Sequence, residues 1–227
     1  MKKLTLIVLC VALGGISFRV MKMYAASDCC SDTSIKVTRK ADNDINRVFL
    51  ARRSSYIMSG ESISAQELQS LFEASRWAPS SYNGQPVRFI YATRGSKHWD
   101  MFMNLMVDFN KSWAKDAAVL VVIVSKDTFD HNGEVSRTHS FDAGAAWENL
   151  ALQATFQGLI AHGMAGFDYD RAKTDLRIPS GYTVEAMVAI GKPGNVETAS
   201  EMVQGLEKRV ADRKPINEIA FEGTFKS

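Results

Sequence analysis

The sequence predicts an α+β fold in which a mixed sheet is flanked by helices. Segments with helical spacing of apolar residues alternate along the chain with short segments rich in β-branched residues. One of these short segments, residues 117–125 (AAVLVVIVS), is apolar throughout, which is typical of a central strand that is covered on both faces. The chain has 227 residues and no internal repeat, so we expect one domain with a single sizeable core.

The first 26 residues have the pattern of a secretory signal peptide. Lys2 and Lys3 precede an apolar stretch, residues 4–18, and a small-residue sequence, residues 24–27. The apolar stretch is shorter than the roughly 20 residues that span a bilayer, so membrane attachment is expected only if this segment stays uncleaved. We expect an exported protein, periplasmic or membrane-tethered. The alternative is a cytoplasmic protein, because translation from Met21 or Met23 would remove the signal.

Residues 27–42 are polar with little periodicity and predict a flexible leader before the domain, residues 43–227. Without the first 26 residues the chain has 23 basic against 25 acidic side chains, which argues against a nucleic-acid partner. Cys29 and Cys30 are adjacent and predict no disulfide framework, and their role stays open. The four histidines have no cysteine neighbours, so we expect surface or solvated-core histidines and no metal site.

The first half of the domain begins with a helix whose apolar residues start at Ile45 and which ends near Arg52. The sequence Ser64-Ala65-Gln66-Glu67 matches a capping box and opens a second helix. That helix must end before Pro79, because proline lacks the backbone donor. A polar loop follows, and residues 87–93 (VRFIYAT) predict a strand.

In the second half, residues 97–110 predict one or two helical turns before the central strand. Residues 140–158 predict a core helix, with Gly158 breaking or capping it. Asp168 is expected to begin a short helix, and residues 184–190 (VEAMVAI) form another strand.

Two sets of side chains on or near the long helix invite a functional reading, but simpler roles are expected. Four aromatic residues are assigned to packing in the core or at a dimer interface: Phe141, Trp147, Phe156 and Phe167. Asp142 and Glu148 are expected to be solvated or helix-start charges rather than catalytic acids.

Three separated segments have the composition of a site for an anion and a heterocycle. They are Arg52-Arg53-Ser54, residues 80–86 (SSYNGQP) and Arg213-Lys214-Pro215. Arginine presents a planar fork of donors that suits phosphate. Each segment alone is weak evidence, because paired arginines are more often a solvated face and a Ser/Asn/Gly loop is often only a turn.

In their order along the chain, these segments resemble the nitroreductase family of flavoproteins. RRS lies near the domain start, APSSYNGQP follows, DAGAAWENLALQATFQGL and HGMAGFD occupy the middle, and DRKPINEIAFEG lies near the end. The resemblance covers about Val48 to Phe225. It implies an α+β fold with two intertwined subunits, and one flavin mononucleotide (FMN) at each of two interface sites.

The resemblance also implies roles for individual residues. Arg52, Arg53 and Ser54, with Arg213 and Lys214, would hold the phosphate and the pyrimidine side of the flavin. The loop residues Ser80, Ser81, Asn83 and Gln85 would line the flavin, partly from the partner subunit. Met164, Ala165 and Gly166 would lie along the flavin, where a backbone amide donates to N5. No catalytic acid or base is required, because the hydride chemistry belongs to the cofactor.

The sequence departs from the family pattern at three positions. Tyr56 stands where the family commonly has a basic residue, so that residue's contact with phosphate or N1 is in doubt. Val87 replaces a frequent tryptophan. Ala165 stands where some members have a glutamate near the flavin, so acceptor preference is open.

The leading functional hypothesis is a homodimeric oxidoreductase that passes hydride from NAD(P)H through FMN to nitroaromatics, quinones or another electron-poor acceptor by a ping-pong mechanism. A related FMN enzyme acting on enones or halogenated aromatics is one alternative. An exported flavin-binding or carrier protein without turnover is another, because NAD(P)H is scarce outside the cytoplasm.

Overall fold

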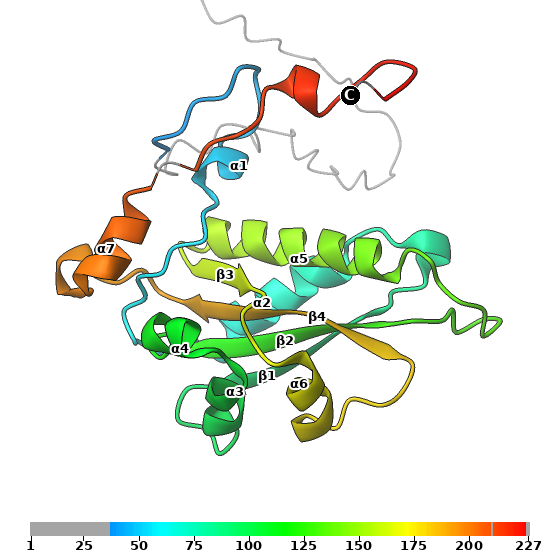
Figure 1. Cartoon of the computed structure of the whole chain (residues 1–227), viewed down its shortest axis with the longest axis horizontal. Coiled ribbons are helices and arrows are strands. Elements are labelled where there is room, and N and C mark those ends of the chain that lie inside the picture. The colour runs from blue at the N-terminus through cyan, green and yellow to red at the C-terminus, as the bar shows by residue number, and fades with distance from the viewer. Residues whose placement is uncertain (1–36, 210, 226–227) are drawn as a thin grey trace, which may run out of the picture.

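A four-stranded sheet forms the centre of the protein. The computed structural model describes residues 37–209 and 211–225 (Figure 1). The strands lie in the order β1-β2-β4-β3, with bounds β1 (Val87–Thr93), β2 (Val119–Lys126), β4 (Tyr182–Gly191) and β3 (Ile160–Met164). Helices cover both faces of the sheet, so the predicted α+β class is confirmed.

The pairing of the strands differs from the predicted mixed sheet. The three neighbouring pairs among these strands, β1/β2, β2/β4 and β4/β3, are all antiparallel. The long helix connects β2 to β3, and these two strands do run in the same direction, but β4 lies between them. The alternation of helices and strands therefore indicated correctly that β2 and β3 are parallel. Because β4 lies between them, these two strands are not paired with each other.

Two layers of helices enclose the sheet. The helices α2 (Ala65–Arg76) and α5 (His139–Phe156) pack on one face, and three short helices pack on the other: α3 (Trp99–Leu105), α4 (Asp108–Ala114) and α6 (Tyr169–Asp175). Alternate residues of β2 point to opposite faces. Val121 and Ile123 join the α2/α5 cluster, while Leu120 and Val122 join the cluster with α3, α4 and α6. This arrangement confirms that β2 is covered on both sides.

Local sequence features begin and end several elements as expected. Ser64 and Glu67 form the complete capping box of α2, with Ser64 Oγ accepting the Glu67 N–H at 3.1 Å and Glu67 Oε2 accepting the Ser64 N–H at 2.7 Å. Asp168 caps α6 by accepting the Arg171 N–H at 2.9 Å. Gly158 follows α5 with φ of 68°, a left-handed conformation that favours glycine.

The remaining elements of the described chain are short, and among them α7 (Glu201–Glu207) places Val203 in the buried cluster with α3, α4 and α6. They also include α1 (Arg47–Ala51) and the short 3-10 helices η1 (Ser81–Asn83), η2 (Val196–Thr198) and η3 (Ile216–Glu218). Figure 1 shows residues 37–46, α1 and residues 211–225 beyond α5, on its side away from the sheet. Residues 211–225 are exposed almost throughout.

Two of the four aromatic residues assigned to packing are not in the core. Phe167 is buried, and Trp147 packs against the α2/α5 cluster. Phe141 and Phe156 are 79% and 51% exposed, because they lie on the face of α5 that points away from the sheet. Burial in the core is therefore wrong for these two, while a subunit interface remains a prediction.

Among the helices of the described ranges, none is both long and apolar enough to span a membrane. The same part of the chain contains no cluster of three His, Cys, Asp or Glu side chains suited to a metal ion. The predicted signal peptide, the leader up to residue 36 and the cysteines lie outside the described residues.

Candidate functional site

The RRS motif lies on an extended segment, residues 52–57, that leaves α1. Asn46 caps α1 by accepting the Val48 N–H at 2.9 Å, and the helix ends at Ala51. Arg52 has φ −57° and ψ 124°, which turns the chain out of the helix. Farther along, the Gly194 N–H donates to the Ile57 carbonyl at 3.0 Å. The segment is thus attached to α1 at one end and to the chain after β4 at the other.

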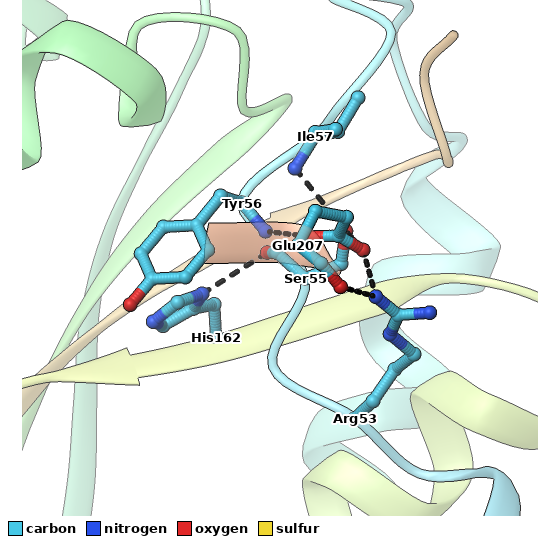
Figure 2. A network of polar contacts seen from close by, with 6 residues as sticks. All are labelled: Arg53, Ser55, Tyr56, Ile57, His162 and Glu207. Carbon is cyan, nitrogen blue, oxygen red and sulfur yellow. Dashed lines mark hydrogen bonds and ion pairs between the residues drawn. The ribbon is translucent and has the colours of Figure 1, made fainter. Parts of the chain in front are cut away.

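Glu207, the last residue of α7, is hydrogen bonded to this segment (Figure 2). Its carboxylate accepts the Ser55 hydroxyl at 2.8 Å and the Tyr56 N–H at 3.1 Å, and it forms an ion pair with Arg53. The Glu207 side chain is only 10% exposed, which strengthens these charge-assisted bonds. Glu207 was not predictable from the sequence, because α7 has no recognisable motif and lies about 150 positions from its partners.

His162 of β3 holds the same segment from the opposite side. Its Nδ1 lies 3.0 Å from the Ser55 carbonyl oxygen, which can only accept, so Nδ1 carries the proton. Burial lowers the pKa of His162 below its ordinary value, while the bond to Ser55 and the charge of Glu207 oppose this effect. His162 is therefore neutral at pH 7. It is a buried, hydrogen-bonded histidine rather than a surface or solvated one.

Tyr56, which replaces a commonly basic residue, has a packing role. Its ring lies edge-on to His162 and Trp113, with centroid distances of 4.6 and 5.3 Å. Phe109 lies edge-on at 6.2 Å. Tyr56 thus helps to bury His162, and it contributes no positive charge to the segment.

Three of the predicted cations lie in one electrostatic neighbourhood. Arg52, Arg213 and Arg53 each lower the pKa of a fourth arginine, Arg39, after the larger effect of burial. Arg52 is 3.8 Å from the partly exposed Glu148, and Arg213 donates to the carbonyl of its neighbour Asp212 at 2.7 Å. Ser54 and Lys214 are exposed beside these arginines in sequence. Arg52, Arg53 and Arg213 thus lie near enough to Arg39 to affect its charge, while their contact with a cofactor stays a prediction.

The polar loop at residues 80–86 is a tight, strained turn. Tyr82, Asn83 and Gln85 have φ of 51°, 53° and 46°, a region that residues other than glycine rarely adopt. The Gln85 N–H donates to Ser80 Oγ at 3.0 Å, and the Ser81 N–H donates to the Asp142 carboxylate at 3.1 Å. Strain of this kind costs about 1–3 kcal/mol per residue and is concentrated at functional sites.

Asp142 is the anchor of this loop, which corrects the expectation that it is solvated. It lies in the first turn of α5, as a helix-start charge should, but it is buried. Its carboxylate also accepts the Thr138 hydroxyl at 3.4 Å. The other expected solvated charge, Glu148, is partly exposed and faces Arg52.

Both predicted halves of the site are attached to the same helix. Asp142 contacts the loop and Glu148 contacts Arg52, and these residues are six positions apart on α5. At 1.5 Å per residue they are separated by about 9 Å along the axis. The helix thus sets the spacing between the loop and the arginines.

Met164 to Gly166, the segment expected to lie along the flavin, is located where β3 ends. Met164 is buried and Ala165 is exposed. The Gly166 carbonyl accepts the Asn110 side-chain N–H at 2.9 Å and the Val107 N–H at 3.1 Å. A Cβ at Gly166 would lie 2.6 Å from Asn110 Nδ2, so a larger residue here would displace the Asn110 side chain. The segment is held closely against the start of α4.

These features together define an α+β protein with an arginine-rich edge that suits an anionic group, and with two backbone segments held firmly nearby. The model of the Nitroreductase family matches the chain over residues 50–102 and 96–192. The chain therefore belongs to the nitroreductase family, as the resemblance indicated.

Individual relatives agree with this assignment. A solved oxidoreductase containing FMN is 40% identical, with a TM-score of 0.80 over 84% of this chain and 98% of the other. A putative nitroreductase from Desulfovibrio desulfuricans, solved in complex with FMN, is 24% identical, with a TM-score of 0.62 over 82% of this chain and 100% of the other, and it supports the fold alone. An uncharacterized 15.4 kDa protein of Mycolicibacterium smegmatis is 32% identical over 61% of this chain and 97% of its own length.

Proposed function

We propose that this protein is an FMN-dependent oxidoreductase that transfers hydride from NAD(P)H to a nitroaromatic, a quinone or a similar electron-poor acceptor. The observation that carries the proposal is the convergence of Arg52, Arg53 and Arg213 beside a rigid extended segment, in a chain of the nitroreductase family. The 40% identical oxidoreductase that contains FMN supports the same cofactor here.

The donor set fits FMN. A phosphate monoester is close to dianionic at neutral pH, and guanidinium groups bind it with charge-assisted bonds. Arg52, Arg213 and Lys214 would hold the phosphate, with Arg53 and Ser54 beside them. Arg53 already pairs with Glu207, so it would contribute fewer free donors than Arg52 or Arg213.

The flavin ring would be held by the two other segments. The loop residues Ser80, Ser81, Asn83 and Gln85 offer hydroxyl and amide groups to the ring edge, and Asp142 fixes the loop to α5. Met164, Ala165 and Gly166 would lie along the ring, with a backbone amide donating to N5. When bound, FMN supplies the hydride chemistry itself, so the chain needs to position the ring and the reactants and to provide donors for negative charge.

A ping-pong mechanism follows from this division of labour. No side chain of the site is proposed as a catalytic acid or base. NAD(P)H and the acceptor would bind in turn at the same place, and each would be oriented by the same backbone and cationic groups. Double-reciprocal plots of rate against acceptor concentration, measured at several fixed NAD(P)H concentrations, should therefore be parallel lines.

We also propose that the protein acts as a homodimer. Residues 211–225 are exposed although they contain Ile216, Ile219 and Phe225, and Phe141 and Phe156 are exposed on α5. This number of exposed apolar side chains indicates a surface that another protein molecule covers. The edge of β1 is open beside a groove of about 380 Å³ that is lined in part by Phe72 and Phe89. A second copy would cover these surfaces, and light scattering at micromolar concentration tests this.

An exported location remains part of the proposal and rests on the sequence of the first 26 residues alone. Fractionation of cells tests it, because full-length protein free in the cytosol would contradict it. An exported enzyme would meet little NAD(P)H, so a different electron donor would then be needed.

The test of function is an absorbance spectrum of the purified protein, followed by anaerobic addition of NADH and then NADPH. Flavin bands that bleach with either nucleotide, and return with a nitroaromatic or a quinone, support the proposal. Flavin bands that persist after NADH and NADPH would favour the carrier alternative. Bands that bleach but return only with an enone or a halogenated aromatic would favour the related enzymes. A colourless protein that takes up no FMN would refute the proposal.

A further inference from the structure

Arg39 lies among the arginines of the site, although it belongs to the polar leader that precedes the domain. Its Nη1 donates to the Arg52 carbonyl at 2.9 Å, and its side chain is partly buried. It comes 13 positions before Arg52. The match to the family model begins at residue 50, so Arg39 is outside the part of the chain that carries the family pattern.

The charges around Arg39 are positive. Arg52, Arg213 and Arg53 all act to lower the pKa of the Arg39 guanidinium, in addition to burial. Like charges at close range repel one another, and partial burial reduces the screening of that repulsion by water. An anion bound beside these guanidinium groups would relieve that repulsion.

The acidic side chains within the described ranges compensate only part of this charge. Glu207 pairs with Arg53, and Glu148 lies 3.8 Å from Arg52 while 46% exposed. Within the same ranges, no Asp or Glu forms an ion pair with Arg39 or Arg213. Among the described residues, the side chains of Arg39 and Arg213 thus donate to backbone carbonyls, those of Arg52 and Asp212, rather than to a carboxylate.

We propose that Arg39 is a phosphate-binding residue that completes the site formed by Arg52 and Arg213. The proposal rests on the function proposed above, and it names the part of the ligand that Arg39 recognises. The bond from Nη1 to the Arg52 carbonyl holds the guanidinium in place and leaves its other N–H donors for an anion. A phosphate monoester can accept these N–H donors, whereas a neutral ligand without phosphate gains nothing from the Arg39 charge.

The experiment compares FMN with riboflavin, which has the same ring without the phosphate. Dissociation constants are measured by flavin fluorescence on full-length protein freed of bound flavin, for the wild type and for Arg39→Ala. A charge-assisted bond contributes about 1.5–3 kcal/mol, so Arg39→Ala should weaken FMN binding about 10- to 150-fold. Riboflavin binding should change less than about twofold. The FMN effect should also shrink as salt concentration rises.

The matched control is Lys40→Ala, which removes the same charge from the adjacent exposed residue and should leave FMN binding within about twofold. Arg39→Lys should recover part of the affinity, which a purely structural defect would not allow. Circular dichroism establishes that each variant is folded.

The outcomes separate the two proposals. Unchanged FMN binding by folded Arg39→Ala overturns the role of Arg39 and leaves the proposed function standing. Equal loss of FMN and riboflavin binding also overturns it, because it assigns Arg39 to the shape of the site. Wild-type protein that binds neither flavin refutes the proposed function, and the role of Arg39 with it.

Discussion

Glu207 is the residue through which α7 stabilises the extended segment, and its replacement is the most informative test of the site. Glu207→Ala removes the acceptor of the Ser55 hydroxyl, the Tyr56 N–H and the Arg53 guanidinium. The substitution leaves two donors on Ser55 and Tyr56 near the protein interior, where an unsatisfied polar group is costly.

The expected magnitude follows from these contacts. Hydrogen bonds to a charged group contribute about 1.5–3 kcal/mol each, and the Arg53 pair adds about 0–1 kcal/mol because Arg53 is half exposed. Water will replace part of this loss, so we expect Glu207→Ala to lower the free energy of unfolding by about 3 kcal/mol. Glu207→Gln keeps the shape and one acceptor oxygen, and it should cost about half as much.

The assay is urea unfolding followed by circular dichroism at one fixed protein concentration, since the stability of the proposed dimer would depend on concentration. Glu201→Gln, at the other end of α7, is the matched control and should change stability by less than about 1 kcal/mol. A double-mutant cycle of Ser55→Ala with Glu207→Ala isolates their hydrogen bond, and we expect a coupling of about 1.5 kcal/mol. A cost below about 0.5 kcal/mol for Glu207→Ala, or no coupling, would refute the reasoning.

Three further predictions concern the residues around this segment. Because the pKa of His162 is lowered in the folded protein, its contribution to stability is present above the unfolded pKa of about 6.5 and is lost as the pH falls below it. Urea titrations from pH 7 to 5 should therefore cost the wild type more stability than His162→Gln, and equal slopes would contradict this. Arg213→Ala should weaken FMN binding about tenfold or more in fluorescence titrations. Arg53→Ala should weaken it less, because Arg53 is paired with Glu207. A larger effect of Arg53→Ala would show that Arg53 is the main phosphate ligand. Gly166→Ala should lower the free energy of unfolding in urea by about 1–3 kcal/mol, since its Cβ would lie 2.6 Å from Asn110 Nδ2. An unchanged unfolding midpoint would mean that Asn110 moves aside freely.

Several parts of the fold were predictable from the sequence because their causes are local. The β1 strand has its predicted bounds, and the capping box at Ser64 begins α2 as expected. A cap or an apolar period depends on residues within a few positions of one another. The segment that forms β3 (IAHGM) was not recognised as a strand, because it is short and contains glycine in place of an alternating pattern.

The site was predictable only in part, for a related reason. The motifs around Arg52, Ser80 and Arg213 have compositions typical of anion and ring binding, and their order along the chain led to the family. The burial of Asp142 was not predictable, because it depends on where the loop at residues 80–86 meets the first turn of α5.

The sequence by itself determined most of the helices and strands, the α+β class and the family, because each depends on local pattern or on the order of motifs. Only the tertiary structure decided the strand order β1-β2-β4-β3, the hydrogen bonds of Ser55 with Glu207 and His162, and the hydrogen bond of Arg39 with Arg52. Glu207 and His162 lie 152 and 107 positions from Ser55. A hydrogen bond across such a separation exists only once the core has brought the two segments together, so no local pattern in the sequence marks it.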